Sequence, residues 1–245
     1  MTGRREPPAF RRVVVESVEP RGLRLTRVVF EGDELAGFTT DHPAASVRLL
    51  LPDPGCSLEI PKWNGNEFLL ADGRRPLLRT FTPWILSPRK IAIDIVIHEG
   101  GATSQWARSA HPGDTVAVSG PGRGHRVNPD AIAFVLGGDE TAVPAISQLM
   151  QAMSSEVDLS VHIVAPADFG RVDLPKRQRS TVTWHELSQD RGEALADAFR
   201  SEERLSDSHI WCAGEAAAMQ RIRKLLFDEL GVSRSRATVR GYWKA

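Results

Sequence analysis

The first half of the chain consists of short runs of β-branched and apolar residues that alternate with polar ones. In the run 91–98, isoleucine recurs at every second position, which places one apolar face on a strand. Proline- and glycine-rich turns separate the runs, and the stretch 53–73 has the composition of a loop. The pattern predicts six strands, at residues 12–19, 23–31, 46–52, 77–83, 91–98 and 114–120. Short strands with tight turns and little helix predict a small antiparallel β-barrel.

One short helix is expected within this half, at residues 101–110. Thr103 or Ser104 is the expected N-cap, because a hydroxyl oxygen at that position accepts a hydrogen bond from a free backbone N–H. The residues 111–113, His-Pro-Gly, end the helix.

The second half alternates strands and helices. Apolar runs predict strands at residues 131–138, 158–165, 180–187 and 208–214. Amphipathic patterns predict helices at residues 141–153, 192–203 and 215–230. Such alternation is typical of a parallel sheet with crossover helices. The stretch 121–130 is dense in glycine, proline and asparagine, so we expect a β-barrel domain over residues 1–126 and an α/β domain over residues 127–245.

Composition and charge narrow the function classes. Lys and Arg number 31 and Asp and Glu number 31, so the formal net charge is zero, which argues against a non-specific nucleic-acid binder. The two cysteines, Cys56 and Cys212, form no CxxC pair, and none of the seven histidines lies in an HxH or HxxH pair. We therefore expect no protein-bound metal. The N-terminal stretch 1–12 is polar and basic, and no run approaches the ~20 apolar residues of a membrane helix, so a cytoplasmic protein without membrane insertion is expected.

Two strand ends in the second half carry small residues followed by polar ones. They are GGDET at 137–141 and CAGE at 212–215. Ligands of open parallel sheets bind beyond the carboxyl ends of the strands, where both segments are expected to lie. Neither segment is a GxGxxG fingerprint, and each fits a tight strand–helix turn as well as a cofactor loop.

Five short segments carry a resemblance when they are taken together. In chain order they are RTFT at 79–82, DIVIHEGGATSQWA at 94–107, LGGDETAVPA at 136–145, WCAGE at 211–215 and GYW at 241–243. This series resembles the siderophore-interacting protein family, the flavin-dependent ferric-siderophore reductases, and covers the chain from about Val13 to the C-terminus. The resemblance implies a ferredoxin–NADP reductase-like architecture, with an antiparallel flavin-binding barrel followed by a nicotinamide-binding α/β domain.

The resemblance also implies residues that bind FAD. Arg79 matches an arginine whose planar fork suits the pyrophosphate oxygens, and the helix start near 102–104 offers free N–H groups to the same anion. Phe81 matches a tyrosine that lies against the flavin ring, and Thr82 matches the residue that hydrogen-bonds the flavin N5 edge, which makes it the catalytic candidate. Trp106 is expected either to pack beneath the cofactor or to belong to the helix core. The expected FAD set is Arg79, Thr80, Phe81, Thr82, His98, Ala102, Thr103, Ser104 and Trp106.

A second implied set binds NADPH or NADH. It consists of Gly138, Asp139, Thr141, Ala142, Gly214 and Glu215, with Trp243 as a C-terminal aromatic near the flavin. Trp243 is expected either to shield a ring face until nicotinamide enters or to act as a packing anchor. The cations Arg171, Lys176 and Arg177 follow the second strand of the α/β domain, so NADPH is favoured slightly over NADH.

The implied activity is electron transfer from NAD(P)H through FAD to a ferric siderophore, with release of iron(II). Ferric siderophores are often anionic, so a basic rim is expected to aid docking. Its candidates are Arg48, Lys62, Arg240 and Lys244. The chain departs from the family pattern at Trp84, where a second arginine is usual, and at Ala102, where proline is usual. A reductase of free flavin or another acceptor, and a siderophore-binding protein without turnover whose flavin site is altered at Phe81 and Trp84, are the open alternatives.

Overall fold

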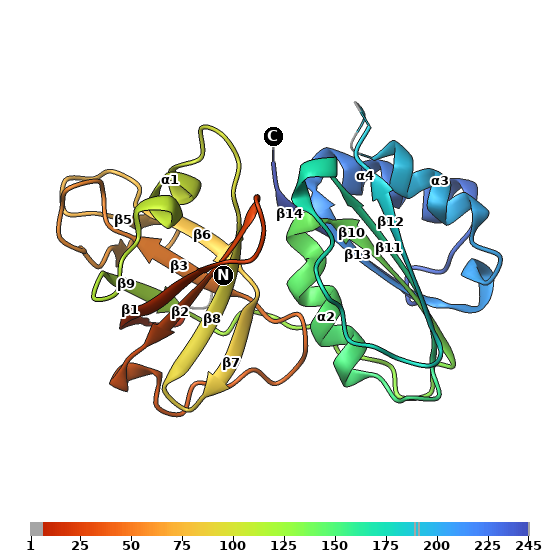
Figure 1. The fold of residues 1–245 in the computed structure, drawn as a ribbon, viewed down its shortest axis with the longest axis horizontal. Helices are drawn as coiled ribbons and strands as arrows, with labels where there is room; N and C mark the ends of the chain where they lie inside the picture. Colours follow the sequence, from red (N-terminus) through yellow and green to blue (C-terminus); the bar gives the residue numbers. More distant parts are fainter. Residues whose placement is uncertain (1–6, 189, 191, 245) are drawn as a thin grey trace. The chain divides into compact units, whose positions relative to one another are not determined.

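The computed structural model describes residues 7–188, 190 and 192–244. The chain divides into two compact units, Met1–His125 and Arg126–Ala245 (Figure 1). Within the described ranges, no helix is long and apolar enough to cross a membrane.

The first unit contains a seven-stranded antiparallel sheet in the order β6–β3–β9–β1–β2–β8–β7. Its strands are β1 (Phe10–Pro20), β2 (Leu25–Glu31), β3 (Val47–Leu51), β6 (Leu77–Phe81), β7 (Pro83–Ser87), β8 (Lys90–Val96) and β9 (Thr115–Ser119). The edge strands β6 and β7 are joined by the single residue Thr82. The sheet therefore has to curl until its edges converge there, which confirms the predicted antiparallel barrel.

Alternating isoleucines fill the inside of this barrel. Ile91, Ile93, Ile95 and Ile97 are each at most 7% exposed and belong to one core cluster, as their spacing predicts. Shorter elements surround the sheet. They are the 3-10 turn η1 (Asp33–Leu35), the small hairpin of β4 (Lys62–Trp63) and β5 (Phe68–Leu69), and the helix α1 (Ala102–Ser109).

Three local expectations in the first unit are wrong. Residues 53–73 are not loop throughout, because the strands β4 and β5 lie within them. Residues 77–83 are not one strand, because the chain leaves β3 after Phe81 and pairs with β8 from Pro83 onward. Proline has no N–H to donate, and the first residue of an edge strand tolerates this loss. The N-cap of α1 is Gly101 and has no side-chain cap, so neither Thr103 nor Ser104 takes that role.

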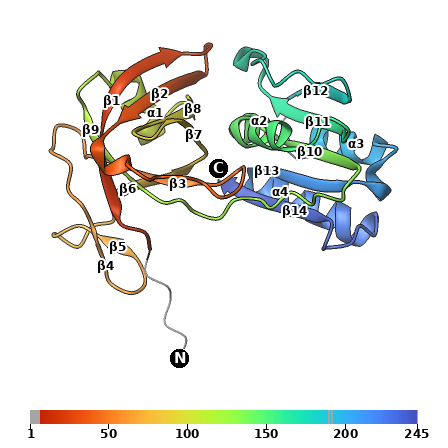
Figure 2. The same cartoon turned by 90° about the horizontal axis from the view of Figure 1, so that it is seen from below.

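The second unit has a five-stranded, fully parallel sheet in the order β12–β11–β10–β13–β14 (Figure 2). Its strands are β10 (Ala133–Asp139), β11 (Asp158–Ala165), β12 (Ser180–Glu186), β13 (His209–Glu215) and β14 (Ala237–Trp243). The helical segments are η2 (Glu140–Ala142), α2 (Val143–Ala152), η3 (Ala167–Phe169), α3 (Glu193–Ser201), η4 (Leu205–Asp207), α4 (Ala216–Lys224) and the π-helix η5 (Leu225–Glu229).

Adjacent glycines in β10 show how helical segments cover both faces of this sheet. A Cβ on Gly137 would lie 2.7 Å from the Phe199 ring of α3, and a Cβ on Gly138 would lie 2.5 Å from Cβ of Ala142 in η2. Because successive strand residues point to opposite faces, α3 and η2 lie on opposite sides. The predicted alternation of strands and crossover helices is confirmed, while β14 is an additional strand.

Candidate cofactor sites

The corner between β6 and β7 carries the first set of expected cofactor residues. Arg79 and Thr80 are exposed, and the Arg79 Nη1 donates to the carbonyl of Leu78 at 3.0 Å. Within the described chain, Arg79 makes no ion pair, so its guanidinium is available to an anion. Thr82 is 8% exposed, and its hydroxyl makes no hydrogen bond to the described residues. This corner therefore presents the Arg79 guanidinium and the Thr82 hydroxyl.

Two aromatic residues of the expected set pack against the barrel core. Phe81 is half-buried against the core cluster. The Trp106 ring stacks on Phe30, with centroids 6.3 Å apart and an interplanar angle of 11°. Trp106 thus holds α1 on the barrel.

The loop that leads into α1 is held by Ser104. This side chain is 1% exposed, and its Oγ accepts a hydrogen bond from the His98 backbone N–H at 3.1 Å. The His98 ring covers Gly101, where an added Cβ would lie 2.7 Å from its Nε2. Ser104 and His98 therefore shape the loop that presents the start of the helix.

The N-terminus of α1 fits a bound anion. The helix begins at the exposed Ala102, and Gly101 supplies no side-chain cap to its first N–H groups. The Thr103 Oγ1 is buried and has no hydrogen-bond partner in the described part of the chain. A buried hydroxyl without a partner costs about 1–3 kcal/mol, and a ligand oxygen at this helix start would supply the partner.

In the second unit, the Asp139 carboxylate joins three strand ends. Its Oδ1 accepts from the Thr141 backbone N–H at 2.9 Å and from the Thr141 hydroxyl at 2.5 Å. Its Oδ2 accepts from the Glu215 backbone N–H at 2.7 Å and from the Trp243 Nε1–H at 2.9 Å. Asp139 is 9% exposed, and burial raises its pKa although all four bonds lower it.

Small residues allow this convergence. A Cβ on Gly214 would lie 2.6 Å from the Asp139 Oδ2, and a Cβ on Gly138 would strike the carbonyl of Ala213. Ala142 is fully buried against Gly138. The structure therefore brings together Asp139, Thr141, Gly214, Glu215 and Trp243 at the carboxyl edge of the parallel sheet.

Glu215 has a structural task at this edge. It is 5% exposed, and its Oε2 accepts from the Ala218 backbone N–H at 2.9 Å, which caps α4. Nothing local in the sequence predicts that Trp243 binds Asp139, because 104 residues separate them.

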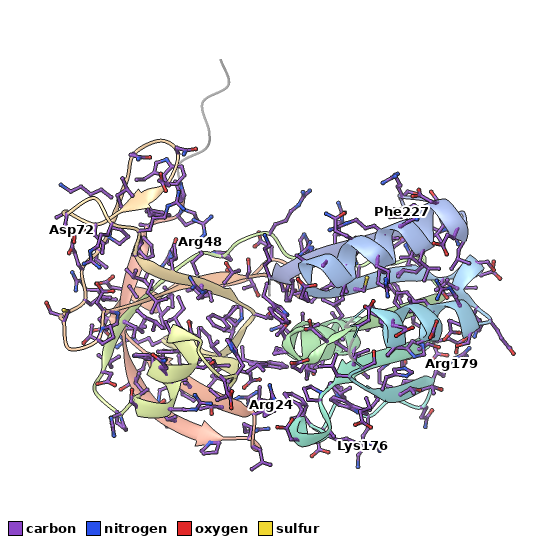
Figure 3. All side chains as sticks on the ribbon, turned by 90° about the horizontal axis from the view of Figure 1, so that it is seen from above. Arg24, Arg48, Asp72, Lys176, Arg179 and Phe227 are labelled. Atoms are coloured by element: carbon purple, nitrogen blue, oxygen red, sulfur yellow. The ribbon has the colours of Figure 1, made fainter. Side chains whose placement is uncertain are left out.

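The expected cations are distributed over both units. Arg48 is exposed (Figure 3) and lies 5.7 Å from the Phe68 ring centroid. Lys62 is exposed on β4. Arg240 is half-buried in β14, and Lys244 is exposed after it.

Arg177 is occupied at the end of α2. Its Nη1 donates to the carbonyls of Met150 at 2.9 Å and Met153 at 2.8 Å, and its Nη2 donates to that of Ser154. The guanidinium therefore satisfies the helix C-terminus, where free carbonyls favour a cation. Arg171 and Lys176 remain exposed in the segment between β11 and β12.

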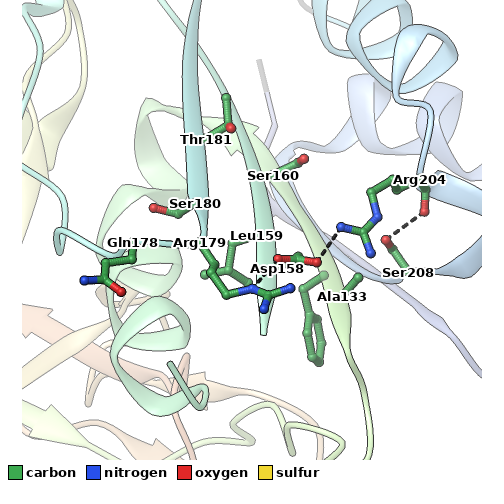
Figure 4. Close-up of a pocket in the computed structure, with 11 residues that line it drawn as sticks. Ala133, Asp158, Leu159, Ser160, Gln178, Arg179, Ser180, Thr181, Arg204 and Ser208 are labelled. Carbon is green, nitrogen blue, oxygen red and sulfur yellow. Dashed lines mark hydrogen bonds and ion pairs between the residues drawn. The ribbon is translucent and has the colours of Figure 1, made fainter. Parts of the chain in front are cut away.

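A polar pocket lies at the opposite, N-terminal end of the parallel strands (Figure 4). Its volume is about 290 Å³. Asp158 lies between Arg179 at 2.6 Å and Arg204 at 2.5 Å. The hydrogen bond from Arg179 and then that from Arg204 hold the pKa of Asp158 well below its usual range. Because the Asp158 carboxylate already pairs with both arginines, we interpret this pocket as the site of an ion-pair network.

Comparison with known proteins adds to this geometry. The family model described as the siderophore-interacting FAD-binding domain matches residues 8–125, and that of the siderophore-interacting protein matches residues 131–245. The NADPH-dependent ferric-chelate reductase of Escherichia coli is 29% identical over 246 residues, which cover 96% of this chain and 93% of that protein. The ferric vibriobactin reductase of Vibrio cholerae is 26% identical, over 94% of this chain and 91% of its own.

Solved structures agree with the sequence comparison. The crystal structure of a siderophore utilization protein from T. fusca superposes with a TM-score of 0.84 at 28% identity, covering 98% of this chain and 94% of that one. The two family models together span nearly the whole chain, which confirms the predicted resemblance. The chain belongs to the siderophore-interacting protein family, and its N-terminal half is that family's FAD-binding domain.

Proposed function

We propose that this protein is a reductase that passes electrons from NAD(P)H through FAD to a ferric siderophore, with release of iron(II). The observation that carries the proposal furthest is the buried, partnerless Thr103 hydroxyl at the uncapped start of α1. An FAD pyrophosphate is an anion of the kind that such a helix start binds. The curated relatives named as ferric-chelate and ferric vibriobactin reductases support the same activity.

The residues of the first unit bind and orient the cofactor in this proposal. Arg79 holds pyrophosphate oxygens together with the first N–H groups of α1 and the Thr103 hydroxyl. Phe81 presents its ring to the flavin, and the Thr82 hydroxyl donates to the flavin N5 edge. FAD, when bound, accepts two electrons from a nicotinamide and returns them one at a time.

The residues of the second unit hold the nicotinamide nucleotide. Gly138 and Gly214 let Ala142, Ala213 and Asp139 pack closely at the carboxyl edge of the sheet, the edge at which ligands of open parallel sheets bind. Asp139 fixes the Trp243 indole at the same edge. Arg171 and Lys176 are exposed cations for a 2′-phosphate, and they favour NADPH, the coenzyme in the name of the Escherichia coli relative.

The acceptor is a chelate of iron(III) by hard oxygen ligands. Reduction to iron(II) weakens such a chelate and releases the metal, so the protein needs no metal ligands of its own. Arg48, Lys62, Arg240 and Lys244 are the cations proposed to attract an anionic siderophore.

Reconstitution with FAD tests the proposal. The purified protein is incubated with excess FAD and passed through a desalting column, and its visible spectrum is recorded. Retention of about one flavin per chain is the expected result. A colourless protein that takes up no FAD would overturn the reductase and leave the siderophore-binding alternative.

A further inference from the structure

Asp94 is the centre of a three-residue cluster on the barrel. Its Oδ1 accepts from the Arg27 Nε at 2.7 Å, and its Oδ2 accepts from the Arg27 Nη2 at 2.8 Å and from the Trp84 Nε1 at 2.9 Å. The Arg27 guanidinium also lies 5.5 Å from the Trp84 ring centroid. The Asp94 side chain is only 7% exposed, so these charge-assisted bonds are shielded from water.

The cluster spans three neighbouring strands. Arg27 on β2 stands directly opposite Asp94 on β8, and Trp84 on β7 stands opposite Ala92. Because Asp94 and Ala92 are two positions apart, Trp84 and Asp94 are diagonal neighbours on one face of the sheet. That face is the opposite of the one that carries the core isoleucines.

The strand β7 depends on this cluster. It is an edge strand of five residues, and among the described strands it pairs only with β8. Its first residue, Pro83, has no N–H for the ladder, and its register shifts between Ile85 and Ser87. Ile85 and Leu86 are 40% and 50% exposed, so the outer half of β7 adds little apolar burial. The bond from Trp84 to Asp94 thus ties the start of β7 to β8.

Thr82 is the residue that this arrangement fixes. It is the sole link between β6, which ends with Phe81 paired to Val47, and β7, which begins at Pro83. If the start of β7 moves, the Thr82 hydroxyl moves with it.

We propose that Trp84 is a positioning residue for Thr82. Through its bond to Asp94, which Arg27 holds in place, it fixes the start of β7 and so aims the Thr82 hydroxyl. This inference rests on the proposed function, in which Thr82 donates to the flavin. It gives a role to one of the positions where the chain departs from the family pattern, because an arginine there would bring a second guanidinium against Arg27 and compete for Asp94.

The first arm of the test needs no cofactor. Amide hydrogen exchange of the FAD-free protein is compared between the wild type and Trp84→Phe, which keeps the ring and removes the N–H. Exchange of the amides of residues 84–87 should be about tenfold faster in the variant. Trp63→Phe in the β4–β5 hairpin is the matched control and should leave these amides unchanged. Unchanged exchange in Trp84→Phe would overturn the inference.

The second arm measures the flavin midpoint potential and the visible circular dichroism of bound FAD. Trp84→Phe and Thr82→Val should each shift both signals, whereas Trp63→Phe should shift neither. If Trp84 acts through Thr82, adding Trp84→Phe to Thr82→Val produces no further shift. Additive shifts would show that Trp84 acts by another route and would overturn the inference. A wild type that binds no FAD would instead refute the proposed function. The exchange result would still test whether Trp84 fixes the start of β7.

Discussion

The indole Nε1–H of Trp243 donates to the Asp139 carboxylate at 2.9 Å, across 104 residues of sequence. The same carboxylate receives hydrogen bonds from Thr141 and from the Glu215 backbone. One buried side chain therefore ties together the ends of β10, β13 and β14 and the start of η2. The Asp139 carboxylate therefore helps to fix the position of Trp243.

Asp139→Asn should lower the free energy of unfolding of the second unit by about 1–3 kcal/mol. An amide keeps the shape but turns its NH₂ group toward two of the four donors, which leaves buried N–H or O–H groups without an acceptor. Trp243→Phe removes one donor and leaves the other three bonds, so it should cost only about 1 kcal/mol. Urea denaturation followed by circular dichroism measures both values. Asp173→Asn, at an exposed position, is the control, and a loss in the control equal to that of Asp139→Asn would contradict this account.

Thr103→Val separates cofactor binding from folding. The Thr103 Oγ1 is buried without a partner in the described chain, so replacing it with a methyl group should leave the FAD-free protein as stable as the wild type or up to about 1 kcal/mol more stable. The same change should weaken FAD binding about five- to tenfold, because a hydrogen bond to phosphate is lost. Thermal unfolding without FAD and fluorescence titration with FAD give the two numbers. A destabilised FAD-free protein with unchanged FAD affinity would refute the role given to this hydroxyl.

Arg79→Ala should weaken FAD binding about 10- to 100-fold, as expected for the loss of a charge-assisted contact to phosphate. Arg89→Ala is the matched control, because Arg89 is also exposed but pairs with Asp33 at 2.7 Å. Equilibrium titration with FAD compares the two variants. Equal affinities would mean that Arg79 does not bind the pyrophosphate.

A histidine pair in the second unit predicts a pH dependence of stability. The His162 Nδ1 lies 3.1 Å from the His185 Nε2, and the His162 Nε2 lies 3.2 Å from the Glu202 Oε2. Burial first, and the charge of His162 second, lower the pKa of His185. In the unfolded chain, His185 therefore takes up a proton near the ordinary histidine pKa of about 6.5, whereas in the folded chain it does so only at a lower pH. The free energy of unfolding therefore falls as the pH drops below about 7.

Urea denaturation at about pH 7.5 and about pH 5.5 tests this dependence. The free energy of unfolding should be lower at the acidic pH, and His185→Gln should reduce the difference. Part of the difference should remain, because burial and then the charge of Arg236 also lower the pKa of His209. An identical drop in the wild type and in His185→Gln would contradict the assignment to His185.

Most of the fold could be predicted because its elements follow local periodicities. The isoleucines at 91–97 show a buried strand face, and the apolar run at 158–165 corresponds to β11. The strand β7 could not be predicted, since Pro83 is usually a strand terminator and only its pairing with β8 makes it a strand start. The strand β14 was not predicted, because Arg240 and Gly241 interrupt its apolar pattern.

The candidate site was predicted as a set of residues but not as an arrangement. The resemblance named Asp139 and Trp243, yet their hydrogen bond joins β10 and β14, which lie on either side of β13 in the sheet. In the same way, the cluster of Trp84, Asp94 and Arg27 joins residues that lie far apart in sequence. Asp94 and Arg27 are 10 and 57 positions from Trp84, on the next strand of the sheet and the one beyond it. Contacts of this kind depend on the register of the sheet, and a single sequence carries no local signal for them.

Anaerobic stopped-flow spectroscopy of the FAD-loaded protein tests the central claim most directly. The protein is first mixed with NADPH or NADH, and the reduced protein is then mixed with a panel of ferric siderophores in the presence of an iron(II)-trapping dye. The account predicts that a nicotinamide bleaches the flavin absorbance, and that at least one ferric siderophore restores it while the dye reports iron(II). A flavin that neither nicotinamide reduces, or a reduced flavin that no ferric siderophore reoxidises, would contradict the account.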